Sequence, residues 1–350
     1  IKDQQGYTID RVDGIDELWS GMYQTLSCVA GDTLVLTDKG YKRIDEVCGQ
    51  REPGRMFDLN DLGVWSKDGM QKATQGVISP KSPTLKIQTK HGLTLEVTKK
   101  HPLYVIDKTG GKMVLAENLN VGDYLRVDIG MDVFGNDNSL DNPDCQEITT
   151  DLAYMIGGYI AEGHMSHNGK KYTAINITNN DQDFKNVYLT NTVVKPFKQY
   201  LSREGRVTCC SNALIKVFED IGVTSSHKCD QKVTPRKIFE CSKDVVAAYL
   251  AGLFDGDGCV NERAITLAST SRRLIQETQL VLLNFGITSD ILQMNREKIL
   301  EREKRTGRLM PGGKPLQSLR ESWHLQIPRA QYRLFSEQIM LRIGRKREKL

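Results

Sequence analysis

The chain carries the sequence YLAGLFDGDG at residues 249–258, an apolar run that stops at two aspartates separated by a glycine. Alanine and leucine favour a helix over residues 245–254. The glycines at 256 and 258 are expected to end that helix by adopting dihedral angles closed to other residues. Asp257 would then lie at the negative end of the helix dipole, which is unfavourable unless a cation joins it. The stretch therefore indicates a metal site.

A second copy of this pattern, MIGGYIAEG, occurs at residues 155–163. The two copies align with an offset of 95 residues, which places Gly157 on Gly252 and Glu162 on Asp257. Such an offset is long enough for a repeated supersecondary unit. Two apolar helices with glycines at matching positions can pack closely together. Their terminal carboxylates would then lie side by side, near enough to share divalent ions.

The paired motifs resemble those of the LAGLIDADG homing endonucleases. The resemblance implies an α+β endonuclease domain over residues 148–350, with two pseudo-symmetric αββαββα repeats at about 148–240 and 244–350. In that family each repeat lays a curved antiparallel sheet into the major groove of double-stranded DNA. Glu162 and Asp257 would hold Mg²⁺, each helping to hydrolyse one strand. The family's basic residue near the active centre corresponds to Lys232, and the chain would act as a monomer on a long, imperfectly symmetric site.

Simpler interpretations of the same residues were weighed. A calcium loop beginning at Asp255 would need oxygen ligands and a glycine where Cys259 and Val260 stand. Two unrelated buried helices ending at glycine turns would explain each motif but not their common spacing. A zinc site is a further alternative, although its candidate ligands lack paired short spacing, so ordinary thiols are the simpler interpretation. These candidates are Cys209, Cys210, His227, Cys229 and Cys241.

The chain from about residue 28 to residue 130 has a different texture. Residues 28–37 alternate apolar and polar side chains, then turn at 38–40 into 41–44, which predicts a hairpin. Short strand-like runs separated by glycine-rich turns favour an all-β module. These runs lie at residues 76–78, 84–87, 93–98, 103–106 and 124–127. Residues 132–144 are turn-rich and acidic, so a linker is expected at 131–147.

Three residues of the β module form a candidate nucleophile and its activators. Cys28 begins the module, and Thr98 and His101 stand three residues apart at the end of a predicted strand. The opening CVAGDT, the Thr-x-x-His pair and LNVGDYL at residues 119–125 resemble the first blocks of inteins, members of the Hint superfamily shared with hedgehog autoprocessing domains.

This second resemblance implies the first step of protein splicing. Cys28 would attack the carbonyl of Ser27 in an N-to-S acyl shift, His101 would protonate the departing nitrogen, and Thr98 would polarise the scissile bond. Residues 1–27 would be flanking host sequence, an N-extein fragment. Inteins of the family end with a catalytic His-Asn pair, and this chain has no such pair in a suitable context. We therefore expect no splicing without a C-terminal intein fragment supplied in trans.

Within the predicted endonuclease the pattern repeats. Residues 172–178 alternate as a strand, and residues 191–202 are typical of a helix. After the second motif, residues 264–269 predict a strand, and 271–287 predict a helix with a serine cap and a glycine stop.

Composition sets the class of protein. Lysine and arginine number 48 and aspartate and glutamate 44, typical of a globular chain, and no apolar run reaches the roughly 20 residues that span a bilayer. Eight scattered cysteines suit a reducing, intracellular and cytoplasmic location. Residues 291–350 hold 15 basic and six acidic side chains, which fits contacts to phosphate.

Two functions compete at this point. The first is an intein-encoded, site-specific double-strand DNA endonuclease fused to an autoprocessing module. The second is a catalytically inactive relic that binds DNA, or a host-protein fragment carrying a degenerate intein. The presence of both motif acids and of Cys28, Thr98 and His101 favours the first.

Overall fold

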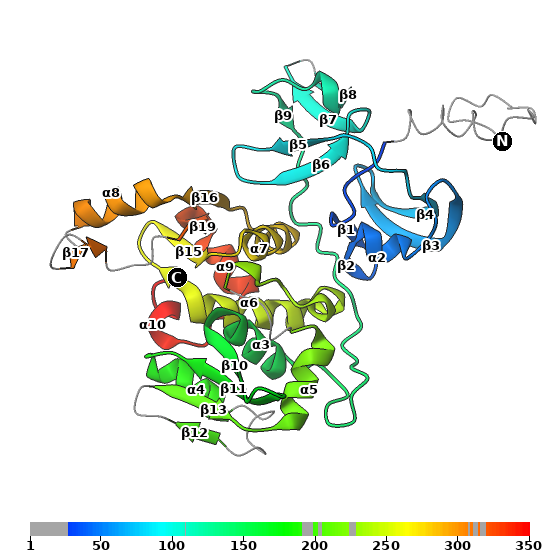
Figure 1. Ribbon diagram of the computed structural model, residues 1–350. Coiled ribbons are helices and arrows are strands. Elements are labelled where there is room, and N and C mark those ends of the chain that lie inside the picture. Colours follow the sequence, from blue (N-terminus) through cyan, green and yellow to red (C-terminus); the bar gives the residue numbers. More distant parts are fainter. Residues whose placement is uncertain are drawn as a thin grey trace, which may run out of the picture. The chain divides into compact units, whose positions relative to one another are not determined.

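The computed structural model describes residues 27–108, 110–190, 199–201, 205–223, 229–306, 309–310, 314–315 and 320–350 (Figure 1). They form two compact units. The first consists of the chain up to Val35 with residues 43–88 and 94–127, and the second consists of residues 36–42, 89–93 and 128–350. The predicted host segment, residues 1–27, lies outside the described residues except for Ser27.

The first unit is built mainly from short antiparallel strands. Residues 34–43 form the predicted hairpin, β1 (Leu34–Thr37) and β2 (Gly40–Arg43), of which residues 36–42 are assigned to the other unit. The remaining elements are α2 (Ile44–Cys48), β3 (Met56–Ser66), β4 (Gly69–Val77), β5 (Thr84–Gln88), β6 (Thr94–Thr98), β7 (Pro102–Asp107), β8 (Gly110–Leu115), η1 (Ala116–Asn118) and β9 (Tyr124–Leu125). β3 pairs with β4, β5 with β6, and β7 with both β8 and β9.

Several of these strands coincide with the sequence prediction, and others do not. β5, β6 and β7 lie where strands are predicted, at residues 84–87, 93–98 and 103–106. β3, β8 and most of β4 have no predicted counterpart. Many side chains of these strands are exposed or half-exposed, so their sequence lacks the apolar alternation that marks a half-buried strand.

The second unit contains the element order αββαββα twice. The first repeat is α3 (Thr150–Glu162), β10 (Gly163–His167), β11 (Tyr172–Thr178), α4 (Gln182–Thr190), β12 (Gln199–Leu201), β13 (Arg206–Cys209) and α5 (Asn212–Ile221). The second is α6 (Lys243–Asp257), β14 (Gly258–Val260), β15 (Ala264–Ser269), α7 (Arg272–Asn284), β16 (Asp290–Met294), β19 (Ser322–Pro328) and α9 (Tyr332–Gln338). Additional short elements are η2 (Cys229–Gln231), η3 (Arg236–Glu240), α8 (Arg296–Thr306), β17 (Leu309–Met310), β18 (Lys314–Pro315), η4 (Arg329–Gln331) and α10 (Gly344–Arg347).

The two repeats also share their sheet topology. The first sheet has the strand order β10-β11-β13-β12, and the second has the order β14-β15-β19-β16. In each sheet the strand that follows the motif helix is at one edge, next to the second strand of the repeat. Neighbouring strands in both sheets are antiparallel. The predicted strands at residues 172–178 and 264–269 are β11 and β15.

The motif helices α3 and α6 contact each other through the paired glycines (Figure 1). A Cβ atom added to Gly157 would lie 2.0 Å from the carbonyl oxygen of Tyr249 on α6. A Cβ atom added to Gly252 would lie 2.0 Å from the carbonyl oxygen of Tyr154 on α3. No real Cβ atom approaches so closely, so glycine is required at both positions. The prediction that the two helices pack at their matching glycines is confirmed.

The role expected for the terminal glycines is wrong in its mechanism. Gly256 lies within α6, which continues to Asp257, and Gly258 has a φ of −80°, which other residues also adopt. Space is the constraint instead, because a Cβ at Gly258 would lie 2.3 Å from the carbonyl oxygen of Phe254. At Gly256 it would lie 2.4 Å from the Cβ of Ala161. The Gly256 contact shows that the two motif helices also lie close together near their ends.

The helix predicted at residues 191–202 is wrong where it can be compared. Residues 191–198 and 202 lie outside the described residues, and Gln199–Leu201 form strand β12, paired with β13. Pairing with a neighbouring strand, a long-range contact, decides the conformation here over local helix preference.

Residues 131–147, predicted as a linker, pack into the second unit. The side-chain amide of Asn284 accepts a hydrogen bond from the Val133 N–H (3.1 Å) and donates one to the Val133 carbonyl (2.6 Å). Phe134 packs against Phe285 with ring centroids 4.7 Å apart. The turn-rich, acidic sequence of this segment predicts a boundary between domains, but Val133 and Phe134 find partners at the C-terminal end of α7.

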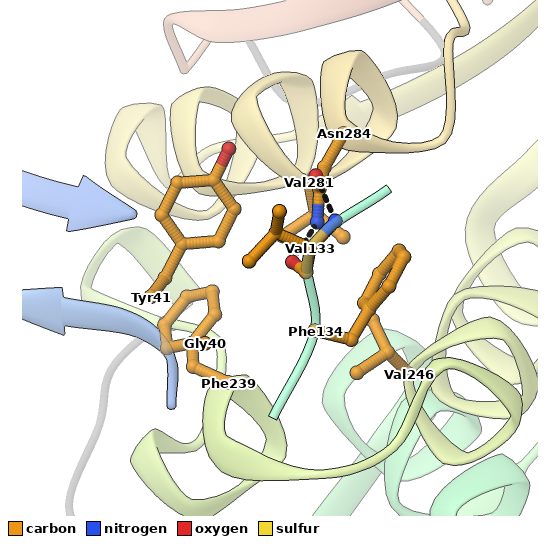
Figure 2. A pocket seen from close by; sticks show the side chains of 8 residues that line it. All are labelled: Gly40, Tyr41, Val133, Phe134, Phe239, Val246, Val281 and Asn284. Carbon is orange, nitrogen blue, oxygen red and sulfur yellow. Dashed lines mark hydrogen bonds between the residues drawn. The ribbon is translucent and has the colours of Figure 1, made fainter. Parts of the chain in front are cut away.

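Figure 2 shows the small cavity beside these contacts. Tyr41, from the hairpin near the start of the chain, lines it together with Phe239, and the Tyr41 hydroxyl donates to the carbonyl of Leu280 at 3.0 Å. The core of the second unit thus includes a segment far away in sequence.

Candidate functional sites

The two motif acids lie at the adjoining ends of α3 and α6. The Cγ of Glu162 would be 3.5 Å from a Cβ at Gly256, one residue before Asp257. Burial and the negative charge of Asp257 raise the pKa of Glu162 to about 7, although Lys232 and Lys346 oppose this. Burial also raises the pKa of Asp257, against the same two lysines. The site therefore holds two mutually repelling carboxylates in a partly dry environment, which is favourable only with compensating positive charge.

Two lysines supply part of that charge, each at the end of one motif helix. The Lys232 ammonium donates to the carbonyl of Ala161 at 2.7 Å, at the C-terminal end of α3. The Lys346 ammonium donates to the carbonyls of Phe254 (2.9 Å), Asp255 (2.7 Å) and Gly258 (2.6 Å), around the end of α6. Cations at these ends complement the helix dipoles.

Sequence reasoning named Lys232 and missed Lys346. The side chain of Lys346 is only 5% exposed, and burial lowers its pKa. In the sequence it stands between Arg345 and Arg347, so the run is typical of a solvated basic surface. Only the topology shows that Lys346 corresponds to Lys232. Lys232 follows α5 and Lys346 follows α9, and these are the equivalent last helices of the two repeats.

The donor set of this site fits magnesium. Among the described residues there is no cluster of three or more His, Cys, Asp or Glu side chains that could enclose a metal ion. Glu162 and Asp257 offer two carboxylates, and Mg²⁺ is characteristically bound by one or two carboxylates, with water and substrate phosphates completing its coordination. Burial, and after it the negative charge of Asp257, raise the pKa of Glu162, and a divalent cation between the acids would oppose both effects.

The sheets flanking the site each present one polar face. In both sheets the side chains in alternate positions are buried and apolar, as with Ile175 and Ile177 in β11. The opposite face carries rows of polar cross-strand neighbours next to the acids. In the first sheet the row is His164, Asn176, Thr208 and Tyr200, and in the second it is Cys259, Thr266, Gln326 and Asp290. Within the first row Asn176 is buried, and its side chain bonds to the hydroxyls of Ser166 and Thr208.

The three residues of the predicted splicing site meet in the first unit. The Cys28 N–H donates to the Thr98 hydroxyl at 3.0 Å, and the Thr98 N–H donates to the Cys28 carbonyl at 2.9 Å. The His101 N–H donates to the Thr98 carbonyl at 3.0 Å, so the strand end turns back beneath Cys28. The buried His101 Nδ1 has no hydrogen-bond partner among the described residues. Burial lowers the pKa of His101, which keeps its imidazole neutral near pH 7.

The candidate zinc ligands Cys209, Cys210, Cys229 and Cys241 form no disulfide. They belong to no group of three or more possible ligands among the described residues, and His227 lies outside those residues.

Comparison with known proteins gives these geometries a context. Residues 244–323 match the family described as a LAGLIDADG-like domain. The replication factor C small subunit of Methanocaldococcus jannaschii is 29% identical over 297 residues, which is 81% of this chain and 15% of that protein. Ribonucleoside-diphosphate reductase NrdEB subunit alpha of Bacillus subtilis is 26% identical over 312 residues, 82% of this chain and 27% of that protein. The chain thus spans less than a third of either relative.

Among solved structures, the homing endonuclease I-DmoI in complex with DNA and Ca has a TM-score of 0.39. It is 12% identical, and the match covers 55% of this chain and 90% of that one. No helix in the described residues is both long and apolar enough to cross a membrane. Residues 244–323, most of the second repeat, are thus the part of the chain that is similar to the LAGLIDADG-like family.

Proposed function

We propose that the second unit is a site-specific endonuclease that cuts both strands of DNA. The observation that carries this proposal is the meeting of Glu162 and Asp257 at the ends of two glycine-packed helices, each end bound by a lysine. Pseudo-symmetric repeats with one acid each suit a substrate with two antiparallel strands. A monomer with two unlike repeats would bind a long site whose halves differ.

The chain's own residues would divide the work. The polar faces of the two sheets would contact base edges, and the basic residues of 291–350 would contact phosphates. Glu162 and Asp257 would hold magnesium, which when bound activates water and stabilises negative charge at phosphorus. Lys232 and Lys346 would balance charge between acids and phosphate. Phosphate contacts also make binding salt-dependent, with a slope of about 0.9 per contact in log affinity against log salt.

A plasmid library incubated with the chain, with and without magnesium, tests the endonuclease. We expect linear product from a defined site in magnesium only, and binding without cutting in calcium. Glu162→Gln should lose the linear product, and Glu219→Gln, the same change on the exposed face of α5, is its matched control and should cut normally. Binding of a defined site without cutting under any metal would indicate an inactive DNA-binding relic instead.

We further propose that residues 28–130 form an intein-type autoprocessing module. The matched relatives support it, because about four-fifths of the chain corresponds to a minor part of each of two proteins with different names. That pattern is typical of a segment inserted into different hosts.

The contacts around Cys28 support the acyl shift. The neutral imidazole of His101 would accept the thiol proton, and the Cys28 sulfur would form a bond to the Ser27 carbonyl carbon. As that carbon–nitrogen bond breaks, imidazolium would return the proton to the Cys28 nitrogen, so no proton is gained or lost. Thr98, which already bonds to the Cys28 N–H, would hold this amide in place.

External thiol tests this module, because it intercepts a thioester. With C-terminal intein segments supplied in trans, excess thiol should release a fragment of residues 1–27, detected by mass spectrometry. Cys28→Ala should abolish the release and His101→Ala should slow it strongly. Release of the same fragment from Cys28→Ala would show that the cleavage is not intein chemistry.

A further inference from the structure

Asp255 is a buried carboxylate that the proposed chemistry does not use. It lies on α6 two residues before Asp257 and is 1% exposed. Its counterpart in the first repeat is Ile160, also buried, so the core does not require an acid at this position. Burying a carboxylate costs free energy unless hydrogen bonds compensate for the lost water, so the partners of Asp255 need an explanation.

The partners of Asp255 lie mainly on the last segment of the chain. Its Oδ2 accepts hydrogen bonds from the Arg342 N–H (2.7 Å), the Ile343 N–H (3.3 Å) and the hydroxyl of Tyr154 (2.8 Å). The Arg342 side chain covers the Tyr154 ring at 4.3 Å and donates to Asp151 at 2.7 Å. Asp255 thus fixes two consecutive backbone amides against α3 and α6.

Those two amides immediately precede the turn that carries Lys346. Ile343 is the residue before α10, and its carbonyl accepts hydrogen bonds from the N–H groups of Lys346 and Arg347, both at 3.1 Å. From this turn the Lys346 ammonium reaches the three carbonyls around the end of α6. Lys346, the lysine beside Asp257, follows the second of these amides, that of Ile343, by only three positions.

We infer that Asp255 is a positioning residue that holds residues 342–346 so that Lys346 stays at the Asp257 centre. This inference rests on the proposed endonuclease function. The Glu162 centre is built differently. Lys232 is half-buried and donates to one carbonyl, and the backbone carbonyl of Lys232 accepts a hydrogen bond from the Ser271 hydroxyl.

Amide hydrogen exchange of the full chain, without DNA, tests the holding role directly. Asp255→Leu removes the acceptor and Asp255→Ser shortens it beyond reach, whereas Asp255→Asn keeps an oxygen for the Arg342 and Ile343 N–H groups. Peptides covering 339–347 should lose protection in the Leu and Ser variants and keep most of it in Asn. Peptides covering α7 report whether each variant is folded. A folded Leu or Ser variant with unchanged protection at 339–347 would overturn the inference.

Cutting of the site found in the plasmid library tests the link to Lys346. Asp255→Leu or Ser should lower the cutting rate by about 10–100-fold with DNA affinity unchanged, the scale of a misplaced catalytic group. Asp255→Asn should restore most of the rate. Combined with Lys346→Met, the Asp255 variants should cut no more slowly than Lys346→Met alone.

If the rate losses of the two single variants multiply in the double variants, Asp255 acts by a route other than Lys346, and the inference is overturned. A wild-type chain that cuts no DNA would instead sink the proposed endonuclease. The exchange experiment would still decide whether Asp255 holds the Lys346 segment.

Discussion

The two repeats of the second unit have the same backbone plan but unlike active centres. The helix interface is nearly symmetric. A Cβ atom added to either motif glycine, Gly157 or Gly252, would lie 2.0 Å from a carbonyl oxygen of the other helix. Around the acids this symmetry is lost. Lys346 is buried and donates hydrogen bonds to three carbonyls, whereas Lys232 is half-buried and donates to one. A shared contact constrains both helices at once. Each centre would face only its own half of the DNA and is free to diverge.

Removal of either acid is the most severe test of this comparison. Asp257→Asn and Glu162→Gln keep shape but remove the charge that would hold magnesium, so each should reduce linear product by about 10²–10⁴-fold. DNA binding should persist. Strand-labelled DNA would show whether the remaining nick falls on opposite strands in the two variants. Linearisation at the wild-type rate by either variant would contradict the paired-carboxylate site.

The helix interface should respond symmetrically to substitution. Gly157→Ala and Gly252→Ala each add a Cβ against an opposing carbonyl, and each should destabilise the chain by about 2–4 kcal/mol in denaturant unfolding, despite the better helix propensity of alanine.

Gly344→Ala is the control, since its added Cβ would lie 3.4 Å from the nearest atom, an Asp183 oxygen. It should change stability by less than about 1 kcal/mol. Clearly unequal effects of the two helix substitutions would mean that the repeats are less alike at their interface than the backbone suggests.

These symmetric features are also the ones that the sequence predicts well. The motif helices and strands β11 and β15 are visible because buried alternation and spaced glycines are local patterns. The helix cap at Ser271 was predicted too, and its hydroxyl accepts from the Leu274 N–H. Wherever a local pattern determines an element, sequence and structure agree.

The features missed depend on distant partners. Lys346 lies 88 residues from Gly258, whose carbonyl it binds, and nothing near it in sequence indicates burial. Val133 belongs to the second unit because of an amide on Asn284, 151 residues away. Strand β12 replaces a predicted helix because β13 pairs with it. The asymmetry of the candidate active centres is therefore tertiary in origin.

The two lysines should differ in what their loss costs. Lys232→Met and Lys346→Met should each slow cutting by about 10–100-fold through lost charge at one centre. Lys346→Met should also lower stability by about 1–3 kcal/mol, because it leaves three carbonyls without their donor. Lys232→Met should cost less than about 1 kcal/mol. Equal stability losses in thermal melts would remove the asymmetry between the centres.

The smallest effect concerns proton binding at Glu162. Its folded-state pKa of about 7 lies above its ordinary value of 4.5, so the folded chain favours the protonated acid. Its contribution to stability is then most favourable below pH 4.5 and is lost as the pH rises through about 7. Without metal, Glu162→Gln should therefore stabilise the chain at pH 8 by about 1 kcal/mol, after allowing for partial solvent exposure, and by almost nothing at pH 4.5.

Magnesium should act in the opposite direction, because it binds the ionised form. Adding it at pH 8 should raise the melting temperature of the wild-type chain, which closes the gap to Glu162→Gln. At pH 5 the same concentration should have little effect, since protons occupy the acid. Glu219→Gln, on the exposed face of α5, controls for the loss of one negative charge at both pH values. A stabilisation by Glu162→Gln that is equal at pH 4.5 and pH 8 would mean that neither burial nor the charge of Asp257 raises the pKa of this acid, and it would contradict a buried pair of carboxylates at the two helix ends.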